Sequence, residues 1–450
     1  MRARLILGWL VVLTMVAAIG YAQTPPAPAP APAAQAAPAV KLSLAEALDI
    51  AQRNNPDYLT YVAARSPASW AVTNSTMKLF TPNASVSGAY TTSGASSGFT
   101  LLGQTFGQTP SYHTNALNLN FSYQLSGASI AQRGYSAAQL HAADMDIAGA
   151  LTLLQTSVKQ AYINLLEARA QADLAEHVVN RDQDLLNLAQ ARFNVGQNTM
   201  IDVRQAQVTK GNADVSLLQA RQAVQVDVLQ LYQWLGVPAP MPPNVEPTDT
   251  FAVVAPAYSE DSLVNLALQA NPTLRAYRAR EGAARWNVRG AYSQYLPSLQ
   301  ATAGTGTSWY TSDASHFRQT SPWTLQVGLS LPIYDGFTRN QQIAQANSQE
   351  ESLNQSIRKE ELTVRATVSA AYLALVTAYQ TIAVQANNKT AAEDALSLAT
   401  ERYRVGSGSI IELNDAAVAA EQAGVTYINA IYGYHKALAA LEQAVGLSLR

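Results

Sequence analysis

The sequence predicts a mainly α-helical fold with a membrane β-barrel portion, built from two copies of one unit. The segment RFNVGQNTMIDVRQA, which begins at Arg192, returns as RYRVGSGSIIELNDA from Arg402, an offset of 210 residues. A repeat of roughly 200 residues is far too long for a solenoid. Segments 115–125 and 323–333 alternate apolar and polar residues, which is the period of a strand. Two long proline-free stretches, 127–237 and 333–450, carry helical periodicity instead.

Residues 1–22 have the pattern of a signal peptide. Arg2 and Arg4 precede an apolar run, and small residues follow at the two positions that a signal peptidase inspects. The alternative is a membrane anchor, but the run is short for a spanning helix. Residues 23–41 are rich in proline and alanine and are expected to form an extended linker.

Composition limits the class of protein. The chain has no cysteine, so it forms no disulfide and carries no lipid on a thiol. Its 29 Lys and Arg and 31 Asp and Glu give a net charge of −2, which becomes −4 without Arg2 and Arg4. This mild charge argues against nucleic acid as a partner. No second apolar stretch is expected to span a membrane as a helix, so the exported chain is periplasmic, secreted, or held in the outer membrane by strands.

The two copies are expected at 42–240 and 258–450, joined by a linker at 241–257. Each copy opens with a short amphipathic helix that ends at an Asn-Pro pair, Asn55-Pro56 and Asn271-Pro272. The first of these helices begins with a capping box, Ser43 to Glu46. A second short helix follows in each copy, to about residues 78 and 295.

Each copy then supplies two strands, within 83–125 and within 298–334. The weaker strands are expected at 83–92 and 298–310, with loops before the stronger ones. At ten to eleven residues, the stronger strands match a tilted transmembrane strand. Six residues are expected to face lipid: Leu117, Leu119, Phe121, Leu325, Val327 and Leu329. An aromatic girdle is expected near the strand ends: Tyr90, Phe99, Tyr112, Trp309, Tyr310, Phe317 and Trp323.

Each copy ends in a long helical hairpin, predicted at 127–236 and 336–446. Apolar residues recur every three or four positions along the first helix of each hairpin, with alanine at many of these positions, so the helices are expected to pack nearly parallel. The first helix of the 127–236 hairpin would be about 100 Å long at the helical rise. Val195-Gly196 and Val405-Gly406 mark the turns. A rod of this length indicates a spacer across a compartment.

The strands also predict an oligomer. Four strands cannot stand alone in a bilayer, because their open edges leave backbone groups unpaired. A closed barrel needs at least about eight strands, so two chains or three satisfy the requirement.

Taken together, these segments resemble the TolC-type outer-membrane efflux proteins over nearly all of 42–447. The resemblance rests on the two turn motifs and on the segment LPIYDG that begins at Leu331. It implies a homotrimer with a twelve-stranded barrel in outer-membrane lipid and a periplasmic α-helical tube. It further implies a periplasmic adaptor, or membrane fusion, protein and an inner-membrane transporter of RND, ABC or MFS type. By this resemblance the chain is the exit duct of a tripartite efflux or type I secretion system.

The resemblance places the periplasmic gate at Asp202, Tyr403, Glu412 and Asp415. Thr199 to Asp202 and Ser409 to Glu412 both match the capping-box pattern, so both acids have a purely structural alternative. In a trimer, Glu412 and Asp415 would form acidic rings, which favour cations. Tyr403 is expected to hydrogen-bond Asp202. Gly408 stands where some relatives carry an arginine, which leaves open how the gate is held closed.

The same turns are expected to dock the adaptor. The residues of this tip are Val195, Gly196, Gln197 and Thr199 in the first copy and Val405, Gly406, Ser407 and Ser409 in the second. The glycines could also be plain helix C-caps, which is compatible with docking.

Signals of catalysis are poor. Gly94 to Gly98 matches the nucleophile-elbow pattern, but it lies in a Gly, Ser and Thr-rich loop with no strand-turn-helix unit around it. The five histidines show no ligand spacing, so no enzyme, cofactor or metal site is expected. The competing hypothesis is a periplasmic coiled-coil scaffold or adaptor without a pore, which has no use for four bilayer-length strands. A passive porin would not explain the hairpins. The sequence does not identify the transported substrate.

Overall fold

A computed structural model of the chain describes residues 40–95, 98–107, 111–237, 245–312 and 315–449. The chain divides into two compact units, Met1–Pro38 and Ala39–Arg450, and the first lies outside the described residues. The expected signal peptide and nearly all of the expected 23–41 linker therefore also lie outside them.

Each repeat contains two short helices and two long ones, as predicted. The first repeat has α1 (Leu44–Asn54), α2 (Pro56–Met77), α3 (Gly127–Asn194) and α4 (Met200–Leu235). The second has α5 (Glu260–Ala270), α6 (Pro272–Tyr292), the 3-10 turn η1 (Ser293–Tyr295), α7 (Thr338–Val405) and α8 (Ile410–Val445). Helices α3 and α7 are 68 residues each, which corresponds to about 100 Å.

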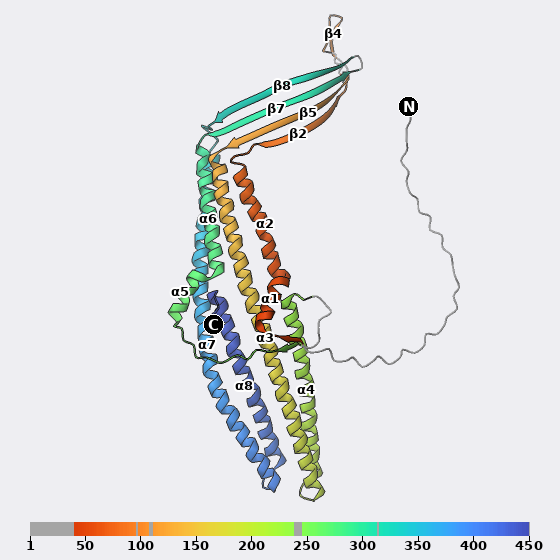
Figure 1. Cartoon of the computed structure of the whole chain (residues 1–450), viewed down its shortest axis with the longest axis vertical. Helices are drawn as coiled ribbons and strands as arrows, with labels where there is room; N and C mark the ends of the chain where they lie inside the picture. The colour runs from red at the N-terminus through yellow and green to blue at the C-terminus, as the bar shows by residue number, and fades with distance from the viewer. Residues whose placement is uncertain (1–39, 96–97, 108–110, 238–244, 313–314, 450) are drawn as a thin grey trace, which may run out of the picture. The chain divides into compact units, whose positions relative to one another are not determined.

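The helices of the second unit pack side by side in four columns (Figure 1). Helix α3 contacts α2, α4, α6 and α8, and α7 contacts α6 and α8. Helix α2 lies above α4, and α6 lies above α8, so the order of the columns is α2/α4, α3, α6/α8 and α7. Each stacked pair thus occupies one column of the layer, as a single long helix does in the other two columns.

The two junctions within the stacked columns are built alike. The side-chain nitrogen of Asn55 donates to the carbonyl of Trp234 in the last turn of α4, at 2.9 Å. Its side-chain oxygen accepts from the backbone N–H of Tyr58 and so caps α2, at 3.0 Å. Asn271 does the same between α8 and α6, with distances of 3.2 Å and 3.1 Å. Each asparagine therefore joins two helices end to end.

Glycine is required beneath both junctions. Gly236 ends α4 with φ +66°, and a Cβ there would lie 2.5 Å from the carbonyl oxygen of Asn54. Gly446 ends α8 with φ +84°, and a Cβ there would lie 2.8 Å from Cδ of Pro272. Only glycine adopts this backbone conformation at low cost, and only a missing side chain permits so close a contact.

Four antiparallel strands form an open sheet at one end of the columns (Figure 1). Their order is β2 (Asn83–Ser93), β5 (Tyr112–Leu125), β7 (Ser298–Ser312) and β8 (Ser315–Ser330). The expected alternation is confirmed by the register. Phe121 lies opposite Ala84 and Ala303, and Ala303 lies opposite Leu325, whereas the next row joins Asn83, Ser122, Thr302 and Gln326. One face of the sheet is therefore apolar and the other polar.

Some strand limits and loops were predicted wrongly. The strand expected to begin at Trp323 begins at Ser315, because Pro322 falls at a register shift opposite Gly304 to Gly306 and does not end the strand. It ends at Ser330 rather than Ile333. Trp323 therefore lies within β8 rather than near a strand end. The loop expected within 94–111 contains a small hairpin, β3 (Phe99–Leu101) and β4 (Gln104–Phe106).

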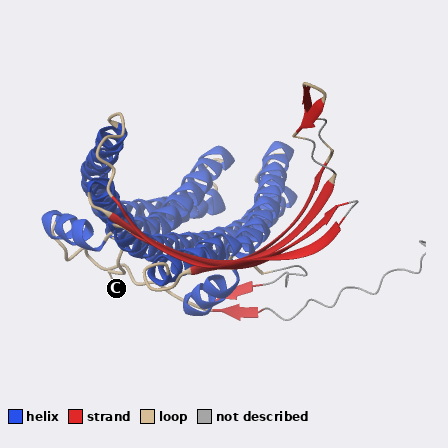
Figure 2. Ribbon diagram, turned by 90° about the horizontal axis from the view of Figure 1, so that it is seen from above, coloured by secondary structure: helices blue, strands red, loops and turns tan. Residues whose placement is uncertain are grey.

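A second small element crosses the columns near the junctions. Strand β1 (Val40–Leu42) pairs in parallel with β6 (Val245–Pro247), so these parts of the expected linkers are strands. Tyr162 of α3 is buried beneath them, and its hydroxyl lies 2.9 Å from the carbonyl of Leu42 and from a carboxylate oxygen of Asp249. Figure 2 shows the sheet curved, with β1 and β6 on its convex side.

The apolar stripes predicted along the long helices form the cores. In the first repeat, Leu154, Val158 and Leu165 of α3 pack against α1, α4 and β6. In the second, the corresponding stripe of α7 packs against α5 and α8. The expectation that no further apolar helix is long enough to span a membrane was wrong. Of the described helices, α7 alone contains an 18-residue window that is apolar enough to cross a membrane, by length and composition.

Candidate functional site

The turns of the two long hairpins lie side by side at the ends farthest from the sheet (Figure 1). They contact each other through an apolar cluster made by α3, α7 and α8. Its buried members are Leu185, Ala399, Tyr403, Ile410 and Leu413. The structure therefore brings the predicted gate and tip residues of both repeats to one place.

The first turn is closed by a glycine and a complete capping box. Gly196 has φ +75°, and the N–H of Gln197 donates to the carbonyl of Arg192 at 2.9 Å. Thr199 accepts from the N–H of Asp202 at 3.4 Å, and the Asp202 carboxylate accepts from the N–H of Thr199 at 3.0 Å. The predicted capping box is confirmed, and it fixes the Asp202 side chain on the backbone of its own turn.

The second turn departs from the prediction. Ser409 caps α8, accepting from the N–H of Glu412 at 3.1 Å, but the Glu412 carboxylate forms an ion pair with Arg402 instead of completing a capping box. Gly406 has φ +86°, and Ser407 N–H donates to the Arg402 carbonyl at 2.9 Å. Arg402 thus contacts the turn through its backbone carbonyl and the start of α8 through its ion pair with Glu412.

Gly408 is held close to the end of α7. Its N–H donates to the carbonyl of Arg402 at 3.0 Å, and a Cβ at Gly408 would lie 3.1 Å from Cβ of Arg402. A larger residue here would need its neighbour to shift. The positive charge at this turn comes from Arg402, six residues earlier, which pairs with Glu412.

Tyr403 is buried between the two turns, and its hydrogen-bond partner was predicted wrongly. The side-chain nitrogen of Asn198 donates to the Tyr403 hydroxyl, whereas Asp202 is engaged by Thr199. Burial raises the pKa of Tyr403, and the nearby Asp202 carboxylate acts in the same direction. The hydroxyl is therefore kept neutral and acts as a hydrogen-bonding group between the repeats.

The guanidinium of Arg192 stacks on the other side of this contact. It lies 4.8 Å from the centre of the Tyr403 ring, and Arg192 is buried. Its Nε and Nη1 atoms make no hydrogen bond within the described part of the chain. Stacking on an aromatic ring partly replaces the lost hydration of a buried cation. Arg192, Tyr403 and Asn198 together connect the last turn of α3, the last turn of α7 and the first interhelical turn.

Exposed apolar side chains surround the contact. Val195 and Val405 are 69% and 72% exposed, and Ile201 and Ile411, which follow the turns, are 72% and 60% exposed. Gln197, Ser407 and Asp415 are also exposed. Paired apolar residues at the ends of two rods form a surface suited to another protein.

Sequence reasoning missed four residues of this region: Arg192, Asn198, Arg402 and the pair position Ile201. All four stand inside the repeated motif, where Arg192 and Arg402 occupy equivalent places. The recurrence of arginine ten residues before each acid is the signal that could have found them. Within the described residues, no group of three or more His, Asp and Glu side chains is placed to hold a metal ion.

Comparison with known proteins gives the same fold. Residues 47–237 and 263–447 match the outer membrane efflux protein family. The chain is 25% identical over 256 residues to the outer membrane efflux protein BepC of Brucella suis, covering 57% of this chain and 55% of that protein. It is 26% identical over 425 residues to the outer membrane protein TolC of Vibrio cholerae, covering 90% of each. The match thus spans about half of the first relative and nearly all of the second.

The crystal structure of the CmeC outer membrane channel of Campylobacter jejuni superposes with a TM-score of 0.75. The sequences are 17% identical, and the superposition covers 90% of this chain and 85% of that chain. The likeness confirms a TolC-like outer-membrane channel fold built mainly from helices. Through the match of both repeats to the family, the chain belongs to the outer membrane efflux proteins, which lie in the outer membrane and extend into the periplasm.

Proposed function

We propose that three copies of this chain form the outer-membrane exit duct of a tripartite efflux or secretion system. The observation that carries the proposal is the four-stranded sheet, which has one apolar face, one polar face and two unpaired edges, β2 and β8. A sheet in a bilayer must close, because unpaired backbone groups there cost several kcal/mol each. Closure between chains gives eight strands for a dimer and twelve for a trimer.

The edges of the helical layer also support closure between neighbouring copies of the chain. Columns α2/α4 and α7 stand at the two edges of the layer, and both expose large apolar residues. Those of α4 include Val208, Val215 and Leu218, and those of α7 include Leu362, Leu373 and Leu398. Joining these edges between copies would bury both rows and produce a tube continuous with the barrel. Three copies agree with the duct implied by the family resemblance.

The far turns supply the second half of the proposal. Their exposed valines and isoleucines would dock a periplasmic adaptor, which recruits an inner-membrane transporter of RND, ABC or MFS type. Val195, Gly196, Gln197, Thr199, Val405, Gly406, Ser407 and Ser409 would form this contact. Similar proteins are named as efflux proteins and channels, and we assign no reaction, cofactor or nucleic-acid partner to this chain.

The gate would lie at the same level. Tyr403, held by Asn198 and Arg192, would keep the second hairpin against the first, with Asp202 fixing the shape of the first turn. Glu412 and Asp415 would face the axis as acidic rings, which concentrate cations at the entrance. In single-channel recordings, Asp415→Asn should weaken cation preference without altering the Arg402 ion pair. Unchanged selectivity would remove Asp415 from the pore.

Oligomeric state and lipid exposure test the duct directly. Native mass spectrometry of the protein in detergent should give a trimer, and a stable monomer would contradict the proposal. Val327→Lys should cost up to about 2–4 kcal/mol because Val327 lies on the apolar face of β8. Gln326→Lys, one residue away on the polar face, is the matched control and should assemble normally. Equal loss of assembled trimer in both variants would contradict the assigned lipid face.

A further inference from the structure

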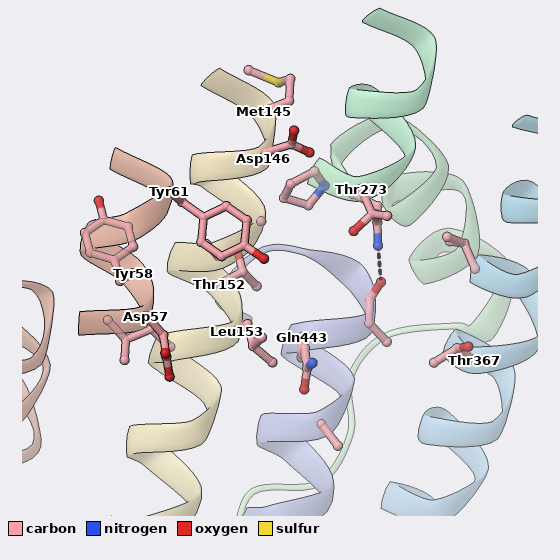
Figure 3. A pocket seen from close by; sticks show the side chains of 18 of the residues that line it. Asp57, Tyr58, Tyr61, Met145, Asp146, Thr152, Leu153, Thr273, Thr367 and Gln443 are labelled. Carbon is pink, nitrogen blue, oxygen red and sulfur yellow. Dashed lines mark hydrogen bonds between the residues drawn. The ribbon is translucent and has the colours of Figure 1, made fainter. Parts of the chain in front are cut away.

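A large cavity lies at the level of the two helix junctions (Figure 3). Its volume is about 1050 Å³, and its lining comes from α2, α3, α4, α6, α7 and α8. Ligand-binding pockets measure roughly 300–1,000 Å³, so this cavity can hold a drug-sized molecule. It is separate from the turns that form the candidate gate.

The periodicity of α3 shows on which side the cavity opens. Asp146, Gly149 and Leu153 line it, and their series continues along the helix to Gln160 and Asn164. The residues of α3 that pack beneath α1 and β6 are instead Val158, Tyr162 and Leu165. The two series lie on different sides of the helix, with Leu154 at their boundary, since it both lines the cavity and belongs to the core. Most of the α3 residues that line the cavity therefore face away from β1 and β6, and these two strands lie on the convex side of the sheet (Figure 2).

One wall of the cavity combines aromatic rings with a carboxylate. Tyr61 of α2 lies four residues after Asp57 and three after Tyr58, so it neighbours both side chains on the helix surface. Tyr61 is 49% exposed and Trp234, at the end of α4, is 36% exposed. Leu153 faces the same space from α3 and is 54% exposed. Apolar side chains that gather in one groove in this way are typical of a ligand-binding surface.

The charged side chains that line the cavity are all acidic. Asp57, Asp146 and Glu360 line it, and none of its described lining residues is Lys, Arg or His. Asp146 is neutralised by Arg280, with N–O distances of 2.6 and 2.7 Å. Asp57 and Glu360 have no ion-pair partner among the described residues. Carboxylates beside exposed aromatic faces attract positive charge both by Coulomb interaction and through the ring faces.

We propose that this cavity binds lipophilic organic cations. The positive centre would lie beside Asp57, with the aromatic or alkyl body against Tyr61, Trp234 and Leu153. Glu360 across the cavity adds to the negative potential. The physiological meaning rests on the proposed duct, in which the concave side becomes the lumen and the cavity becomes a place where a cationic substrate pauses during export.

Equilibrium binding tests the site without requiring transport. The purified full-length protein, in nanodiscs of zwitterionic lipid, is titrated with tetraphenylphosphonium by calorimetry, with empty nanodiscs as the blank. Saturable binding is expected, and Asp57→Asn should weaken it by about five- to tenfold because one close charge is lost. Tyr61→Leu, which keeps the charge but removes a ring, should also weaken it.

Matched controls separate charge from size and from damage to the fold. Triphenylphosphine oxide has similar rings without a net charge, and its weaker binding should not change in Asp57→Asn. Asp49→Asn removes an equal charge on α1, where Asp49 pairs with Arg53 away from the cavity, and should leave affinity unchanged. Equal affinity for the cation and the neutral compound, or no effect of either cavity variant, would overturn the proposal. Binding that persists in a protein that does not conduct would leave the site standing and refute only the duct.

Discussion

The helix junctions of the two repeats are nearly identical, whereas their turns are not. At the junctions, Asn55 and Asn271 make the same pair of hydrogen bonds above glycines of positive φ. At the turns, Asp202 completes a capping box, but Glu412 pairs with Arg402. The duplicated unit has thus kept its geometry where two helices are joined and has changed it where the two hairpins meet each other.

Junctions and turns differ in what they connect. A junction joins two helices of one column end to end, and the same hydrogen bonds do so in both columns. The turns contact each other, so their partners are complementary rather than equal. The first hairpin contributes Asn198 and Arg192, and the second contributes Tyr403. The Tyr403 hydroxyl accepts a hydrogen bond from Asn198, and its ring stacks against the Arg192 guanidinium. Because the contact joins unlike groups, losing it leaves the bonds within each hairpin in place, as the proposed gate requires.

The junctions should show the largest effects. Gly236→Ala forces a side chain into a left-handed backbone and against the Asn54 carbonyl, so we expect a loss of about 3 kcal/mol in unfolding free energy. Gly446→Ala should cost a similar amount, because its geometry is the same. Thermal unfolding of the purified protein measures both.

Gly211→Ala is the control for these two variants. Gly211 lies within α4, and no atom lies within 4 Å of a Cβ built there. The substitution should be neutral or should stabilise the helix by about 0.5–1 kcal/mol. If either junction variant behaves like Gly211→Ala, the two junctions are not equivalent.

The contribution of Tyr162 to folding stability should depend on pH, unlike that of its counterpart in the second repeat. Burial, aided by the Asp249 carboxylate, raises the pKa of Tyr162 to about 12. Because the folded protein holds this proton more tightly than the unfolded chain, the stabilisation is complete below about pH 10 and is lost as the pH rises to about 12. Tyr372 is the equivalent residue of the second repeat and, among the described residues, makes no such contact to a linker carboxylate.

Unfolding measured across pH 9–12 checks this difference. Tyr162→Phe should flatten part of the alkaline loss of stability, whereas Tyr372→Phe should leave the profile unchanged. Identical profiles for both variants would mean that the β1–β6 element does not depend on the Tyr162 proton.

Sequence periodicity predicted most of this fold because it reports on local geometry. The long helices, their glycine ends and the two faces of the strands all follow from spacing along the chain. The partners of Tyr403 and Glu412 do not, because they depend on how two turns 210 residues apart come together. Asp202 was a reasonable partner for Tyr403 by residue type, but its own turn already occupies it. The continuation of β8 through Pro322 was also hidden, since a strand tolerates proline at a sheet edge or at a bulge, and only the structure shows that Pro322 has both.

The contact between the turns should show a smaller, pairwise effect. Tyr403→Phe and Asn198→Ala each remove the same hydrogen bond, which contributes about 0.5–1.5 kcal/mol. A double-mutant cycle should therefore give a coupling energy of this size, and either variant should raise single-channel conductance by loosening the closed state. Asp202→Asn should show no coupling with Tyr403→Phe. Coupling to Asp202 instead of Asn198 would restore the partner expected from the sequence.

The smallest expected effect concerns the two acids. Arg402 and Glu412 are 47% and 41% exposed, so their ion pair contributes about 0–1 kcal/mol and weakens as salt increases. Asp202 acts mainly through hydrogen bonds to its own turn, so Asp202→Ser, which keeps a short polar side chain, should be insensitive to salt. Hydrogen exchange of the amides in 196–202 and 406–412 at low and high salt distinguishes the two. Glu412→Gln should speed exchange in the second turn at low salt and match the parent at high salt. If both turns respond to salt alike, then Glu412 is a helix cap like Asp202, and the asymmetry of the turns lies in Tyr403 alone.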